Sequence, residues 1–96
     1  MPSAGSATLD AAGQDLYKDS DGCTEFLVKC LAASANRVLV NVPGLHIAAE
    51  FFILEKGAEV TFRLNDLGIR QVFAKGEGGA ASVTYGIVSK TNPRSW

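Results

Sequence analysis

The 96 residues of this chain are enough for one domain, and their nine basic and ten acidic side chains leave a net charge of −1. The charges are scattered, with no lysine or arginine stripe to neutralise a run of phosphates. No apolar run approaches the roughly 20 residues that span a bilayer, and the N-terminus lacks the basic and apolar regions of a signal peptide. We therefore expect no nucleic-acid partner, no membrane partner and residence in a cytoplasm.

The first 22 residues differ in composition from the rest, because they are rich in Ala, Gly, Ser and Asp. Their only sizeable apolar side chains are Leu9, Leu16 and Tyr17. Such a stretch cannot bury enough apolar surface to fold by itself. The sequence therefore predicts a flexible N-terminal arm over residues 1–22, ordered only by docking on a neighbour, and one domain over residues 23–96.

From residue 24 onward, short runs rich in β-branched and aromatic residues alternate with turn residues. Their starts are about 11 residues apart, a spacing typical of a sandwich or small barrel. The predicted strands cover residues 24–32, 36–42, 48–54, 58–65, 69–75 and 80–89. The pattern predicts an all-β fold: a small antiparallel β-sandwich or barrel, jelly-roll-like, of about six strands with an N-terminal arm.

The residues between these runs favour turns. Pro43-Gly44 supplies the fixed φ and then the positive φ of a type II turn. Glycine is expected to let the chain reverse at Lys56-Gly57 and at Leu67-Gly68. Residues 76–79, which include three glycines, predict a hairpin loop between the last two strands.

Four of the six predicted strands carry apolar side chains on both faces; in one, Phe51 and Ile53 alternate with Phe52 and Leu54. A two-layer sandwich covers only one face of each sheet, and a small domain buries a modest share of its surface. Leaving Phe52 and Leu54 exposed would forgo about 1.5–3 kcal/mol each. We therefore expect the N-terminal arm, another copy or a different partner to cover them. The alternative is that two-faced strands are central strands of an irregular barrel.

The two cysteines are Cys23 and Cys30. If residues 23–30 form one extended segment, the pair is roughly 23 Å apart, whereas a disulfide needs Cα atoms within about 7 Å. The sequence therefore predicts two free thiols, with Cys30 as a small core residue.

His46, Glu50 and Gly57 match the second half of the first cupin motif, H-x3-E-x6-G. A histidine and carboxylate metal site needs three or four convergent ligands. Gly44 stands where the cupin family has its other histidine, and His46 is the only histidine of the chain. We therefore predict no metal and no cofactor, and interpret His46 as a loop residue at an interface.

Other catalytic arrangements also lack residues. A nucleophilic triad would need His46 as its base, and nothing places a nucleophile beside it. Glu55 and Glu59 flank a turn and are interpreted as solvated carboxylates. The glycine-rich residues 76–79 open no helix, so they are no phosphate-binding loop. We predict no enzymatic activity and no catalytic residues.

The last residue, Trp96, is the only tryptophan and follows Arg94 closely. Trp and Arg are favoured at the centres of protein interfaces, so this end of the chain is expected either to anchor in a neighbour or to fold back on its own domain. The residues predicted to form an interface are Leu16, Tyr17, Leu45, His46, Phe52, Leu54 and Trp96.

Four segments resemble the small β-sandwich accessory proteins of tailed bacteriophage virions: residues 37–44, 54–62, 68–76 and 80–88. The shared pattern is a Gly-x-x-Val-Thr turn, then Gly-Ile-x-x-Val-x-Ala-Lys, and then a glycine-rich loop into the last strand. The resemblance covers residues 36–90. Proteins of this kind decorate or cement capsids, or form fibre and tail domains, without catalytic residues.

The resemblance implies a viral structural protein that decorates or cements a phage capsid. Its partners would be its own copies, with a trimer favoured, and the major capsid protein; it would assemble in the host cytoplasm and reside in the virion. One alternative is a receptor- or glycan-binding module of a fibre or tail, in which Phe51, Phe52 or Trp96 stacks on sugar rings. A further alternative is a cupin-like small-molecule binder.

Overall fold

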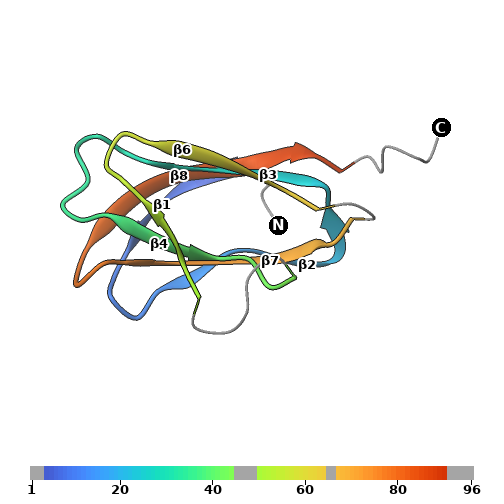
Figure 1. The fold of residues 1–96 in the computed structure, drawn as a ribbon, viewed down its shortest axis with the longest axis horizontal. Coiled ribbons are helices and arrows are strands. Elements are labelled where there is room, and N and C mark those ends of the chain that lie inside the picture. The colour runs from blue at the N-terminus through green and yellow to red at the C-terminus, as the bar shows by residue number, and fades with distance from the viewer. Residues whose placement is uncertain (1–3, 45–49, 65–66, 91–96) are drawn as a thin grey trace.

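The computed structural model describes residues 4–44, 50–64 and 67–90. These residues form two antiparallel four-stranded sheets that pack face to face (Figure 1), so the predicted all-β sandwich is confirmed. The strands are β1 (Ala4–Leu9), β2 (Gln14–Cys23), β3 (Glu25–Cys30), β4 (Val38–Asn41), β5 (Phe52–Leu54), β6 (Glu59–Arg63), β7 (Ile69–Gly76) and β8 (Ala81–Ser89). Strands β3 to β8 correspond to the six predicted strands.

The first sheet has the strand order β1-β8-β3-β6, and the second has the order β2-β7-β4-β5. Only β4 and β5 follow each other within one sheet, and every other connection crosses between the sheets. This interleaving is the connectivity of a jelly roll. The prediction of a hairpin between the last two strands is wrong, because β7 and β8 belong to different sheets. The same flexible glycine residues serve here as a crossover.

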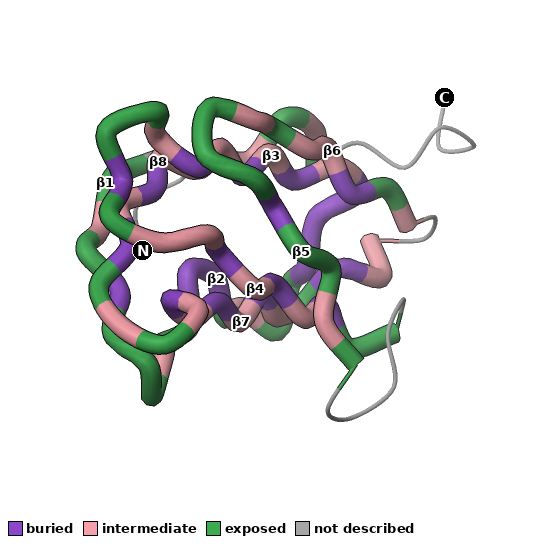
Figure 2. Tube along the Cα trace, turned by 60° about the vertical axis from the view of Figure 1, so that its left-hand side comes forward, coloured by how far each residue is buried: buried purple, intermediate pink, exposed green. Residues whose placement is uncertain are grey.

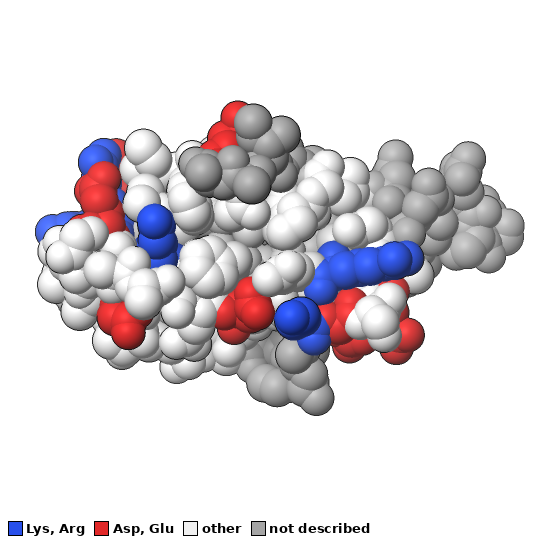
Figure 3. Space-filling model, turned by 90° about the horizontal axis from the view of Figure 1, so that it is seen from below, with Lys and Arg blue, Asp and Glu red and all other residues white. Residues whose placement is uncertain are grey.

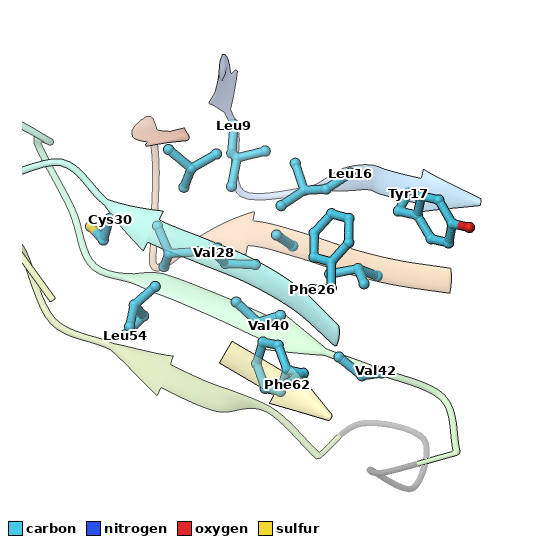
Figure 4. Packing of buried hydrophobic residues seen from close by; sticks show 14 of the residues in the cluster. Leu9, Leu16, Tyr17, Phe26, Val28, Cys30, Val40, Val42, Leu54 and Phe62 are labelled. Atoms are coloured by element: carbon cyan, nitrogen blue, oxygen red, sulfur yellow. The ribbon is translucent and has the colours of Figure 1, made fainter. Parts of the chain in front are cut away.

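The N-terminal segment is part of the sandwich, so the prediction of a flexible arm is wrong for residues 4–22. Strand β1 pairs with β8 and β2 pairs with β7, one at the edge of each sheet. Leu9, Leu16 and Tyr17 point into the core from these strands (Figure 4). Their burial supplies the apolar contact that the composition seemed to lack, because the small and polar residues between them face outward or lie in turns.

The core lies between the two sheets and forms one cluster, seen as the buried residues of Figure 2. Phe26 lies near its centre, with its ring 5.4 Å from that of Tyr17 and 6.1 Å from that of Tyr85. Each such buried side chain contributes roughly 1.5–3 kcal/mol. The buried members are Leu9, Leu16, Tyr17, Cys23, Phe26, Val28, Cys30, Val38, Val40, Val42, Leu54, Phe62, Ile69, Val72, Ala74, Ala81 and Val83.

The outer faces of the two sheets show what covers the strands that carry apolar side chains on both faces. Strands β3, β4 and β7 are inner strands of their sheets, and their outward Leu27, Leu39 and Phe73 are half-buried among neighbouring side chains. The central-strand interpretation therefore accounts for these three strands. The fourth, β5, lies at the edge of the second sheet.

Two of the turns differ in how well the sequence predicted them. Gly44 has a φ of 100°, as the predicted type II turn after Pro43 requires. Before β7 the prediction is wrong in detail, because the left-handed residue is Leu67, with a φ of 56°, and not Gly68.

Candidate assembly surface

Strand β5 exposes apolar side chains on both of its faces. Phe52 is 40% exposed and Ile53 is 49% exposed. Phe52 lies opposite the buried Val40, on the inner side of the sheet, and its ring meets the ring of Phe62 edge-on at 5.7 Å. Ile53 lies on the outer side, opposite Leu39. The apolar surface therefore wraps around the edge of the second sheet, at the open side of the sandwich between β5 and β6.

Figure 3 looks onto the outer face of the second sheet, where uncharged side chains predominate and the charged ones stand between them in separate groups. Next to β5, the Lys75 Nζ lies 4.5 Å from the centroid of the Phe51 ring. Such a cation–π contact contributes about 0.5–1 kcal/mol at an exposed site. The ammonium group already occupies one face of this ring, so a sugar could stack there only by displacing it.

At the opposite end of β5, Arg37 holds three connecting segments together. Its Nε and Nη2 donate to the two carboxylate oxygens of Glu77, each at 2.7 Å, and its Nη1 donates to Glu55 at 2.8 Å. The Glu77 backbone N–H also donates to the Arg37 carbonyl at 2.9 Å. This cluster, the Arg37 clamp, joins the residues that precede β4 to those that follow β5 and β7.

The hydrogen bonds of the Arg37 clamp shift the pKa values of two of its residues. The hydrogen bonds from Arg37 lower the pKa of Glu77, and those to Glu77 and Glu55 raise the pKa of Arg37. A hollow of about 410 Å³ lies beside it, lined by Ala35, Asn36, Arg37, Glu55, Lys56 and Glu77. The guanidinium is already bound by two carboxylates, which makes the clamp a structural device and not a binding site for an anion.

A second hollow, of about 330 Å³, is lined by Lys18, Asp19, Ser20, Pro43, Arg70 and Gln71. Neither Lys18 nor Arg70 forms an ion pair with another described residue. The Asp19 carboxylate accepts the backbone N–H of Asp21 at 2.9 Å. Two cationic side chains, one carboxylate and the Ser20 hydroxyl therefore line this hollow.

The two cysteines are free, as predicted, and Cys23 is buried as well as Cys30. They belong to different sheets, because the chain turns at Thr24 between β2 and β3, so the assumption of one extended segment is wrong although its conclusion holds. Burial raises the pKa of the Cys23 thiol, and a protonated, buried thiol is a poor nucleophile.

Tyr17 lies beside Cys23. Burial, with smaller contributions from Cys23 and Asp19, raises the pKa of Tyr17 to about 12. Its hydroxyl is buried, and the only described group beside it that could share a hydrogen bond is the Cys23 thiol, which is a weak partner. Neither side chain is ionised near neutral pH, and we assign this pair no chemistry.

Of the residues predicted to form an interface, the structure buries some, leaves one exposed and does not describe the others. Leu16, Tyr17 and Leu54 are 5%, 1% and 2% exposed, so the prediction that they contact a partner is wrong, because they fill the core of their own domain. Phe52 remains on the surface. The other three predicted residues, Leu45, His46 and Trp96, lie outside the described residues.

On β5, Ile53 is the exposed residue that sequence reasoning missed. The sequence placed Phe52 and Leu54 on the outward face of their strand and Ile53 on the inward face, and the structure reverses this assignment. A strand that is apolar on both faces gives no signal for which face is buried. The exposed pair on β5 is therefore Phe52 and Ile53.

The cupin-like pair cannot be assembled into a metal site from the described residues. Glu50 is exposed, and His46 lies outside the described residues. Across residues 4–44, 50–64 and 67–90, no three His, Cys, Asp or Glu side chains come together as metal ligands. The same residues include no helix long and apolar enough to cross a membrane.

Comparisons of the chain with protein-family models, with curated proteins and with solved structures find no match.

Proposed function

We propose that this chain is a non-catalytic structural domain that acts by assembling with other protein surfaces through β5. The observation that carries the proposal is the exposed apolar pair Phe52 and Ile53, one on each side of an edge strand. Contiguous exposed apolar surface on a small domain marks an interaction site, and an edge strand adds unpaired backbone groups to it.

The assembly that we propose is decoration of a tailed-phage capsid, with further copies of the chain and the major capsid protein as partners. The pattern likeness over residues 36–90 supports this proposal. A second support is fold-level analogy, because jelly rolls recur in viral capsid domains. Many weak contacts on a symmetric shell add up through effective concentration, so one small apolar edge in each copy is enough for stable attachment.

The test is to express the tagged full chain in the cells that carry its gene, separate the lysate on a density gradient and image the fractions by electron microscopy. We expect the chain to travel with icosahedral shells and to label their outer surface. The variant Phe52→Ser should shift it toward the top of the gradient. The matched control Val88→Lys should not, because Val88 is 53% exposed on the first sheet. A wild-type chain found only as a small free oligomer would contradict the proposal.

A further inference from the structure

The four edge strands of the sandwich differ in chemistry. Exposed edges are usually protected by charge, proline, bulges or very short strands. Strand β1 is built of small residues apart from the buried Leu9. Strand β2 carries Lys18 and Asp19 and has two irregularities in its register, and β6 begins at Glu59 and ends at Arg63. Strand β5 is short, but its residues are Phe, Ile and Leu. It is therefore the one edge, among the described strands, whose side chains favour association.

The sequence around β5 is complementary to itself in charge. Ile53 is the midpoint of the strand, and Glu50 and Lys56 lie three residues before and three residues after it. Both are exposed, and neither forms an ion pair with another described residue. Glu50 lies just outside the strand, and Lys56 lies in the turn that leads from β5 to the first sheet. An antiparallel β5 from a second copy, centred on Ile53, would therefore bring Glu50 of each copy near Lys56 of the other, at the two ends of the paired strands.

The same register matches the apolar residues. It sets Ile53 against Ile53, and Phe52 against Leu54, on opposite faces of the joined sheet. A shift of two residues places Glu50 against Leu54 in one direction, or Lys56 against Phe52 in the other. A shift of one residue exchanges the two faces. The alternation of faces therefore excludes the one-residue shifts, and the flanking charges favour this register over the two-residue shifts.

From these observations we propose that two copies of this chain pair antiparallel through β5, which joins their second sheets into one continuous sheet. This is β-strand addition between identical edges. The contact uses the same residues in both copies, so two copies satisfy it and no third can join through β5. The inference therefore predicts a dimer, whereas the phage resemblance implies a trimer. The inference rests on the proposed function only in that both use β5 as the contact.

The decisive experiment reverses the two charges separately and together. Sedimentation velocity on the full chain would compare the dimer Kd of the wild type with those of Glu50→Lys, Lys56→Glu and the double variant. Each single reversal replaces two attractive pairs by two repulsive ones, so we expect Kd to rise about tenfold. The double variant restores opposite charges, and its Kd should return to within about twofold of the wild type.

A second pair of variants tests the apolar centre. Ile53→Lys places two ammonium groups face to face and should leave only monomer, whereas Val88→Lys on the first sheet should leave the dimer unchanged. Circular dichroism and thermal unfolding would verify that each variant is folded. A wild-type monomer at high concentration, a dimeric Ile53→Lys variant, or a double variant as weak as the single ones would overturn the pairing.

The outcomes separate this inference from the proposed function. A chain that dimerises through β5 but leaves phage shells unlabelled would contradict only the decoration proposal. A chain that stays monomeric yet travels with shells in a Phe52-dependent way would contradict only the pairing of two copies.

Discussion

Strands β2 and β5 are the two edges of the same sheet, and they are held and protected in opposite ways. Strand β2 is ten residues long and is fixed by the core side chains Leu16 and Tyr17, while Lys18 and its register irregularities blunt the free edge. Strand β5 has three residues and a single core side chain, Leu54, and its other two side chains are exposed. The comparison shows that core side chains hold β2 in the sandwich, whereas most of the side chains of β5 are left exposed.

The largest effect should come from the side chain that fixes β2. Tyr17→Ala removes a buried ring that contacts Phe26, and we expect a loss of about 3–5 kcal/mol in the free energy of unfolding. Tyr17→Phe removes only a buried hydroxyl whose one described hydrogen-bonding neighbour is the weakly bonding Cys23 thiol, so it should change the free energy of unfolding by no more than about 1 kcal/mol. Urea unfolding of both variants checks this; a strongly destabilised Tyr17→Phe would show that the hydroxyl has a stronger partner.

The same pair of variants predicts a pH dependence. The pKa of Tyr17 is raised to about 12 in the folded chain, whereas an unfolded tyrosine titrates near pH 10. The folded state therefore keeps a proton that the unfolded state loses, and stability falls as the pH rises between these two values. Above pH 10, the Tyr17→Phe variant should be more stable relative to the wild type than it is at neutral pH, and its free energy of unfolding should fall less steeply as the pH rises.

The second prediction concerns adjacent side chains at β5. Leu54 is 2% exposed and Phe52 is 40% exposed. We expect Leu54→Ala to cost about 2–4 kcal/mol, and Phe52→Ala to cost about 1 kcal/mol, largely from the lost edge contact with Phe62. Chemical unfolding at low protein concentration, where association does not contribute, measures the difference. Equal losses would mean that Phe52 is a core residue and not part of a surface.

The third prediction compares the turns that lead to the two edges. Gly13, before β2, and Gly57, after β5, have nearly the same φ, 84° and 83°. A Cβ on Gly13 would lie 2.6 Å from the Phe73 ring and 2.7 Å from the Ala74 carbonyl oxygen, whereas one on Gly57 meets nothing closer than 3.8 Å.

We therefore expect Gly57→Ala to cost about 1–2 kcal/mol from backbone conformation alone, and Gly13→Ala to cost about 1–3 kcal/mol more because the site is crowded. Thermal unfolding of the two variants under one condition measures the ranking. If Gly57→Ala proved the more damaging change, the close contacts around Gly13 would not limit the fold.

Strands β3 to β8 could be predicted from the sequence because alternation and turn residues recur there at regular spacing. Strands β1 and β2 could not, because the register of β2 is irregular and its inward Leu16 and Tyr17 are adjacent, so no period-2 signal survives. A glycine-rich turn is compatible with both a hairpin and a crossover, so the β7–β8 connection needed the structure. The Arg37 clamp joins residues 18 and 40 positions apart, a distance over which the sequence gives no pairing signal.

The smallest effect should come from the clamp that fixes the end of β5. Arg37 lowers the pKa of Glu77, so the clamp stabilises the fold above the ordinary glutamate pKa of about 4.3 and loses this contribution as the pH falls through the lower, folded value. Glu77→Gln should therefore lower the Tm slightly at pH 7. Between pH 5 and pH 2, the Tm of this variant should fall by less than the Tm of the wild type. Glu59→Gln is the matched control, because Glu59 forms no ion pair with a described residue. An acid dependence unchanged by Glu77→Gln would mean that solvent screens the clamp fully, and that the position of β5 depends on Leu54 alone.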